Sequence, residues 1–73
     1  MRPSSSPSFS ADSFHAGRAA GKAVAFAITQ GWAATASLEV CEQYADGPTG
    51  WWLSAWRRGY LQALGAQGYA HLA

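Results

Sequence analysis

Apolar residues recur at three- and four-residue spacing along much of the chain, a pattern that predicts helices burying one face. The first helix is expected to begin at Ser10 or Asp12, either of which could cap it. Its buried face is predicted to consist of Phe14, Gly17, Gly21, Val24 and Ile28. The two glycines of this stripe lie one turn apart and lower helix propensity, so we expect another backbone or a bulky ring to pack closely against them. The tryptophan rings of a later helix would fit this groove.

The middle of the chain carries a second helical pattern, from Trp32 to Tyr44. Its apolar side is formed by Ala33, Ala36 or Ser37, Val40 and Tyr44. Gly31 either kinks or ends the first helix, so one bent helix and two separate helices both fit the pattern. Residues 46–50, with the sequence Asp-Gly-Pro-Thr-Gly, predict a clear break.

Beyond this break the pattern predicts a last helix. Its stripe consists of Trp52 or Leu53, Trp56, Tyr60, and Ala63 or Leu64. Gly65 and Gly68 are expected to fray its end. Because no segment alternates in the manner of a strand, we predict an all-α fold, either a small antiparallel helical hairpin or a three-helix arrangement.

An aromatic residue stands three positions before a glycine twice, as Phe14 before Gly17 and as Trp56 before Gly59. Two matched positions are too few for a sequence repeat. We interpret them as similar packing chemistry in the two helices.

The N-terminal segment differs from the rest of the chain. Residues 1–10 are rich in serine and proline and lack apolar periodicity, so we predict a flexible, disordered tail. Residues 11–73 then form a single helical domain, since the length allows no second one. An apolar fraction of 49% with 12% charged residues argues against disorder there. So short a chain buries a modest fraction of its surface, which is compatible with a homodimer or a partner-stabilised fold.

The net charge of +1 gives no strong overall field that would attract nucleic acid or an anionic membrane. The charges are unevenly distributed, however. The first and last helices carry the basic residues Arg18, Lys22, Arg57 and Arg58, and the middle carries the acidic residues Glu39, Glu42 and Asp46. The sequence therefore predicts two basic helices around an acidic middle.

Three of the four tryptophans stand at positions 51, 52 and 56, directly before two arginines. The cluster is either the core of the helical fold or a stacking and cation–π surface for another molecule. The stripe favours a core position for Trp52 and Trp56. Trp51 lies one position off the stripe and is a candidate for partner binding as much as for the core.

The basic side chains are further candidates for partner binding. Arg57 and Arg58 are either a solvated helix face or a contact to RNA or to an acidic protein. Arg18 and Lys22 lie one turn apart, and they either clamp a phosphate or pair with the acidic residues of the middle. The predicted partner-binding residues are Trp51, Arg57, Arg58, Arg18 and Lys22.

No pattern in the chain indicates catalysis. Cys41, His15 and His71 are scattered and lack the close spacing of a zinc signature, and Cys41 is predicted to be a small buried hydrophobe. A nucleophile elbow and a phosphate-binding loop are both missing from the sequence. We therefore expect no enzymatic activity, no metal and no cofactor.

The sequence also bears on location. The lone cysteine suits a reducing cytosol, and the serine- and proline-rich start does not resemble a secretory signal. The uncharged run over residues 23–38 is too short and too polar for a membrane span. A membrane-surface peptide using Phe26, Ile28 and Trp32 is a third interpretation, for which the basic face is thin. We expect a cytoplasmic protein without a membrane partner.

Three motifs follow one another at a characteristic spacing. They are Gly-Arg-Ala-Ala-Gly at residues 17–21, Cys41 with Tyr44 nearby, and Trp-Leu-Ser-Ala-Trp-Arg at residues 52–57, which begins 11 residues after the cysteine. In this arrangement the chain resembles the ribosome modulation factor family of small bacterial proteins over residues 14–64. The resemblance implies a two-helix protein without catalysis that binds ribosomal RNA and protein on the small subunit and blocks translation during dormancy.

The function expected from this resemblance is occupation of a site on the ribosome or a similar nucleoprotein complex, with contact to ribosomal RNA. Small inhibitors encoded by phages and mobile elements, including anti-CRISPR proteins, are of similar size. The alternative is therefore an inhibitor of that kind that binds a host protein surface. Salt dependence separates the two, because phosphate binding weakens steeply with salt whereas an apolar protein interface is comparatively indifferent.

Overall fold

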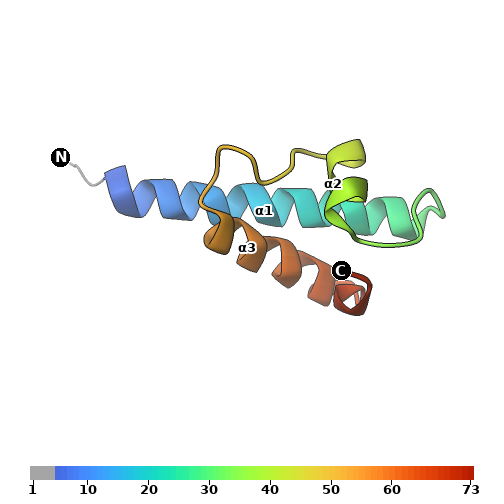
Figure 1. Ribbon diagram of the computed structural model, residues 1–73. Coiled ribbons are helices and arrows are strands. Elements are labelled where there is room, and N and C mark those ends of the chain that lie inside the picture. The colour runs from blue at the N-terminus through green and yellow to red at the C-terminus, as the bar shows by residue number, and fades with distance from the viewer. Residues whose placement is uncertain (1–4) are drawn as a thin grey trace.

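The computed structural model describes the backbone of residues 5–73 and the side chains of residues 10–73. Its elements are the α-helices α1 (Ser5–Thr29), α2 (Leu38–Tyr44) and α3 (Leu53–Ala66), followed by the 3₁₀ helix η1 (Ala70–Leu72). The described residues form no β-strand. The predicted all-α fold is confirmed, and the three-helix arrangement is the alternative that is observed (Figure 1).

The long helix α1 forms the axis of the molecule, and α3 packs along it in the same direction (Figure 1). Gly17 lies against Trp56 near the start of α3, and Thr29 Oγ1 lies 3.1 Å from the Tyr69 hydroxyl just after its end. The connection that contains α2 leads the chain back along α1 before α3 begins. The two long helices therefore run parallel. An antiparallel hairpin of α1 and α3 is therefore not formed.

Helix α1 begins at Ser5, and the residues expected to cap it, Ser10 and Asp12, lie inside the helix. Of the predicted disordered tail, residues 1–4 lie outside the described residues. The side chains of residues 5–9 are likewise not described. The backbone of residues 5–10 belongs to α1 and is helical, where a tail without regular structure was expected.

Glycine ends both long helices by the same hydrogen-bond arrangement, the Schellman motif. At the end of α1, Gly31 has a φ of 80°, its N–H bonds to the Ile28 carbonyl, and the Trp32 N–H bonds to the Ala27 carbonyl. The apolar contact that accompanies this motif is made by Phe26 and Trp32, whose ring centroids are 5.6 Å apart. Gly31 therefore ends the helix and does not kink it.

At the end of α3, Gly68 has a φ of 81° and takes the same role. Its N–H bonds to the Gly65 carbonyl, and the Tyr69 N–H bonds to the Leu64 carbonyl. Gly65 lies within α3. The expected fraying of this helix is therefore wrong, because the two hydrogen bonds give it a defined end.

The predicted helix from Trp32 to Tyr44 is wrong for residues 32–37, which are not helical. The backbone of Ala36 bonds elsewhere, because its N–H donates to the Leu72 carbonyl and its carbonyl accepts from the Tyr60 hydroxyl at 2.7 Å. Helix α2 starts only after Ser37, whose Oγ accepts the Val40 N–H. The predicted break at residues 46–50 is confirmed.

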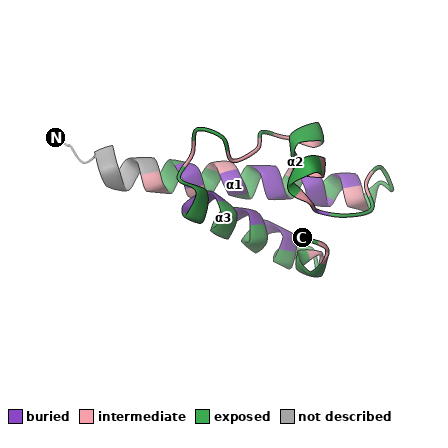
Figure 2. Cartoon of the chain, viewed as in Figure 1, coloured by how far each residue is buried: buried purple, intermediate pink, exposed green. Residues whose placement is uncertain are grey.

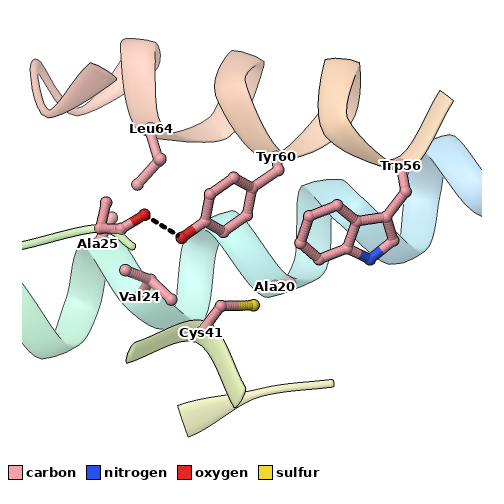
Figure 3. Close-up of a cluster of buried hydrophobic side chains, with 8 residues drawn as sticks. Ala20, Val24, Ala25, Cys41, Trp56, Tyr60 and Leu64 are labelled. Atoms are coloured by element: carbon pink, nitrogen blue, oxygen red, sulfur yellow. Dashed lines mark hydrogen bonds between the residues drawn. The ribbon is translucent and has the colours of Figure 1, made fainter. Parts of the chain in front are cut away.

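The core lies between α1 and α3 and is closed by α2 and the segment before it (Figure 2). Its buried residues are Ala20, Val24, Ala25, Ala36, Cys41, Trp56, Tyr60 and Leu64. The rings of Trp56 and Tyr60 stack with centroids 4.9 Å apart (Figure 3). Cys41 is fully buried, as predicted.

Trp52 is 48% exposed, so its predicted core position is wrong. Leu53, the alternative at this point of the stripe, is also exposed. Helix α3 begins at Leu53, and Trp52 precedes it with extended backbone angles, so its side chain is not part of the helical stripe. The stripe begins at Ala55 and Trp56 instead.

The glycines of α1 allow the two long helices to approach closely. A Cβ atom on Gly17 would collide with the Trp56 carbonyl, and one on Gly21 would lie 2.6 Å from the Tyr60 carbonyl oxygen. In return, a Cβ on Gly59 of α3 would collide with the Phe14 carbonyl. The two aromatic-x-x-glycine segments are therefore reciprocal halves of one helix contact. The expected tryptophan rings do not occupy the groove, because the backbone of α3 fills it.

Candidate partner-binding surface

The four described lysine and arginine side chains are all exposed and lie on the two packed helices α1 and α3. We call Arg18, Lys22, Arg57 and Arg58 the cationic surface. A Cβ on Gly59 would lie 2.9 Å from the Arg18 backbone nitrogen, so Arg58, its chain neighbour, belongs to the same helix crossing as Arg18. Lys22 follows one turn further along α1 on the side of Arg18.

The acidic residues Glu39 and Glu42 lie on α2, which packs against α1. Within residues 10–73, no ion pair joins Arg18 or Lys22 to a carboxylate. Arg18 and Lys22 therefore do not pair with the acidic residues of the middle, which was one of the two predicted alternatives. Arg18 and Lys22 thus carry charges that no carboxylate of the described residues pairs.

Trp51 is half-buried and packs against the core. Trp56 is fully buried, and its indole Nε1 finds no hydrogen-bond acceptor among the described residues. The three tryptophans therefore do not form one exposed stacking surface. The predicted role of Trp51 in partner binding stays a prediction.

Two apolar hollows in the surface lie next to Arg57 of α3. The first, of about 270 Å³, is lined by Ala36, Ser37, Leu38, Trp56, Arg57, Tyr60, Leu61 and Ala73. The second, of about 540 Å³, is lined by Leu53, Ser54, Arg57, Arg58 and Leu61. We call the two hollows together the α3 groove. Arg57 and Leu61 line both hollows, so a basic and an apolar side chain stand where the hollows meet.

The sequence interpretation missed Leu38 and Leu61 as surface residues of this groove. Leu61 follows Arg57 by one turn, and Leu53 precedes Arg57 by one turn, so all three share a face of α3. This spacing was visible in the sequence. The contribution of Leu38 was not, because it depends on how the start of α2 and the two residues before it pack on α3.

Ser13 positions the start of α3 and was also missed. Its side chain is fully buried, and its Oγ accepts the Trp52 N–H at 2.9 Å. Trp52 precedes the helix and has no capping side chain of its own. A residue of α1 therefore satisfies a backbone donor at the start of α3 and ties the beginning of α3 to α1.

Tyr60 holds the segment beside the first hollow in place. Its hydroxyl donates to the Ala36 carbonyl, the dashed line in Figure 3. Burial raises the pKa of Tyr60 to about 12, and the neighbouring Cys41 adds to the rise. Burial also raises the pKa of the Cys41 thiol, with further contributions from Glu42 and Asp46.

The raised pKa of Tyr60 predicts a loss of stability in alkali. Between the usual tyrosine pKa of about 10 and the folded value of about 12, the unfolded chain loses its phenolic proton first, so stability falls as pH rises. The fall attributable to this group is about 2–3 kcal/mol. Urea unfolding at several pH values measures it. The Tyr60→Phe variant should be less stable below pH 10 but should show a flatter decline above it, and an equally steep decline would contradict the assignment.

The remaining chemistry of the surface is limited. Within residues 10–73, no three histidine, cysteine, aspartate or glutamate side chains lie close enough together to hold a metal ion. The Cys41 thiol is buried and donates to the Asp46 carbonyl at 3.6 Å. Among the described helices, none combines the length and the apolar character needed to cross a membrane. Comparison with known family models, curated proteins and solved structures finds no match to this chain.

Proposed function

We propose that this protein is a non-enzymatic inhibitor that occupies a site on the ribosome or a similar nucleoprotein complex, with the cationic surface against RNA. The carrying observation is that Arg18, Lys22, Arg57 and Arg58 are exposed on two packed helices without carboxylate partners within the described residues. The resemblance to the ribosome modulation factor family supports the same target. Such a protein would act in the cytoplasm.

The physical basis is phosphate neutralisation from a rigid support. Arginine offers a planar fork of donors that matches a phosphate, and lysine offers a compact charge. Because α1 and α3 are held together by their glycine contact, the backbone that carries the four cations needs little ordering on binding. Inhibition would follow from steric occupation, for which no catalytic group is required.

Salt dependence tests the proposal. If four cations displace counterions from single-stranded RNA, raising salt from about 0.05 to about 0.2 M should weaken binding by roughly 50-fold. Co-sedimentation with purified bacterial small ribosomal subunits measures this, and inhibition of a cell-free translation reaction is the functional readout. The double variant Arg18→Glu with Lys22→Glu should bind much more weakly at low salt. Absence of binding and of inhibition at low salt would overturn the proposal.

A second candidate is a phage or mobile-element inhibitor, such as an anti-CRISPR protein, that binds a host protein surface. The observation favouring it is the α3 groove, where Leu38, Leu53 and Leu61 are 41%, 49% and 40% exposed. Binding through such a groove would change little over the same range of salt. The salt titration therefore separates the two candidates.

A further inference from the structure

The α3 groove consists of two apolar hollows that share Arg57 and Leu61. Leu61 lines both of its hollows, Leu38 lines one and Leu53 the other. The three leucines are 40–49% exposed. Contiguous exposed apolar side chains with a charged rim are typical of interaction sites.

The positive charge at the α3 groove indicates that its partner carries negative charge. Arg57 lines both hollows and Arg58 lines the second. Residues 47–73 contain no aspartate or glutamate, and within the described residues neither arginine forms an ion pair. A protein partner that fills the hollows is therefore expected to bring a carboxylate to Arg57, since otherwise a guanidinium would be covered without compensation.

The α3 groove lacks the features that an extended peptide or a nucleobase would need for binding. The described residues contain no β-strand, so no sheet edge is available for an extended peptide to pair with. The rings that line the first hollow, Trp56 and Tyr60, are 0% and 3% exposed, so they offer no face on which a nucleobase could stack. An apolar helix face suits the two hollows better than either of these ligands.

We propose that the α3 groove binds an acidic amphipathic helix of a partner protein, with one apolar side chain in each hollow and a carboxylate on Arg57. The inference goes beyond the proposed contact with RNA. It uses the outer face of α3, whereas Arg18 and Lys22 lie on α1. Arg57 is shared with the cationic surface. Leu61→Ser, which keeps every charge, is therefore the variant that separates binding of the helix from binding to the ribosome.

A synthetic helix tests the inference on the full-length protein. The probe is a fluorescent, alanine-based peptide of about 15 residues, with leucines one and two turns apart on one face and glutamates beside them. We expect saturable binding by fluorescence anisotropy. Arg57→Gln and Leu61→Ser should each weaken it by at least roughly tenfold, since one removes the charge partner and the other part of the apolar lining.

Two controls make the result specific. Lys22→Gln removes the same charge away from the α3 groove and should change affinity by less than about twofold, because exposed charges act weakly at a distance in salt. A peptide with glutamine in place of each glutamate should bind at least roughly tenfold more weakly. Circular dichroism verifies that each variant keeps its helices, so that lost binding is not lost folding.

Four outcomes would each overturn the inference. The probe could fail to bind at about millimolar concentration, or the glutamine peptide could bind as tightly as the acidic one. Lys22→Gln could weaken binding as much as Arg57→Gln does, which would indicate general charge attraction. Finally, sedimentation could show self-association that Leu61→Ser abolishes, which would make a second copy of this chain the occupant of the groove.

Discussion

Replacing Gly17 by alanine should destabilise the protein by about 3 kcal/mol or more, although alanine is the better helix former. The added methyl group would collide with the Trp56 carbonyl, and both partners of this contact are backbone held within helices. Neither can rotate away, so α1 and α3 would have to separate. Thermal and urea unfolding of the purified variant measure the loss.

The matched control is Gly65→Ala, the same substitution in the other long helix. Gly65 is exposed, and an added Cβ would meet only the Ala70 side chain at 3.9 Å, an ordinary contact distance. This variant should be more stable than the parent by about 0.5–1 kcal/mol. If both substitutions raised stability, the close approach of the helices at Gly17 would be wrong.

The double variant Arg57→Glu with Arg58→Glu should lose at least about 100-fold in affinity for the nucleoprotein target while keeping its helix content. Each arginine is expected to make a charge-assisted hydrogen bond of about 1.5–3 kcal/mol with the target, and reversal adds repulsion. Exposed arginines contribute little to folding. Co-sedimentation together with circular dichroism measures both properties on one sample.

The control for this variant is Trp56→Ala, which removes a fully buried ring from the core. It should cost about 3–5 kcal/mol and unfold much of the protein. Binding would then be lost together with structure, whereas the charge reversal loses binding alone. If the double reversal bound the target as well as the parent does, Arg57 and Arg58 would be only a solvated face.

The spacing of apolar residues was enough to predict the all-α fold and most of the packed face of α1. Gly17, Gly21 and Val24 are all buried. In a regular helix, residues spaced three or four positions apart share one face, so the spacing predicts which side chains are buried. Cys41 was likewise assigned to the core correctly. The glycines at one-turn spacing correctly indicated a close contact, although with a backbone and not with rings.

Positions at the ends of helices were harder to predict, since a stripe fixes a face but not where the helix starts. Trp52 fits the stripe of α3, yet it precedes the helix and is exposed. Residues 32–37 have helical composition, but the bonds of Ala36 to Leu72 and Tyr60 are tertiary and have no local signal. The connection between α1 and α3, which these bonds hold in place, also sets the direction of α3 relative to α1.

The candidate surface could likewise be predicted only in part. The basic character of the first and last helices was readable from the sequence, because charge is a property of composition. The first hollow of the α3 groove was not, since it combines residues 36–38 with residues of α3, whereas the second hollow is lined by α3 alone. Ser13 also gave no signal, because its partner Trp52 is 39 positions away in the chain.

The parallel arrangement of α1 and α3 has a kinetic consequence. Thr29 and Tyr69, which meet beyond the ends of the two helices, are 40 positions apart in the sequence, and Ser13 and Trp52 are 39 apart. A long loop must therefore close before any contact between these helices forms, and its entropy is lost before burial compensates for it. In an antiparallel hairpin the first contacts would close a short turn. We expect this chain to refold more slowly than helical hairpins of its size, and during synthesis α1 must wait for α3 to leave the ribosome before it has a partner.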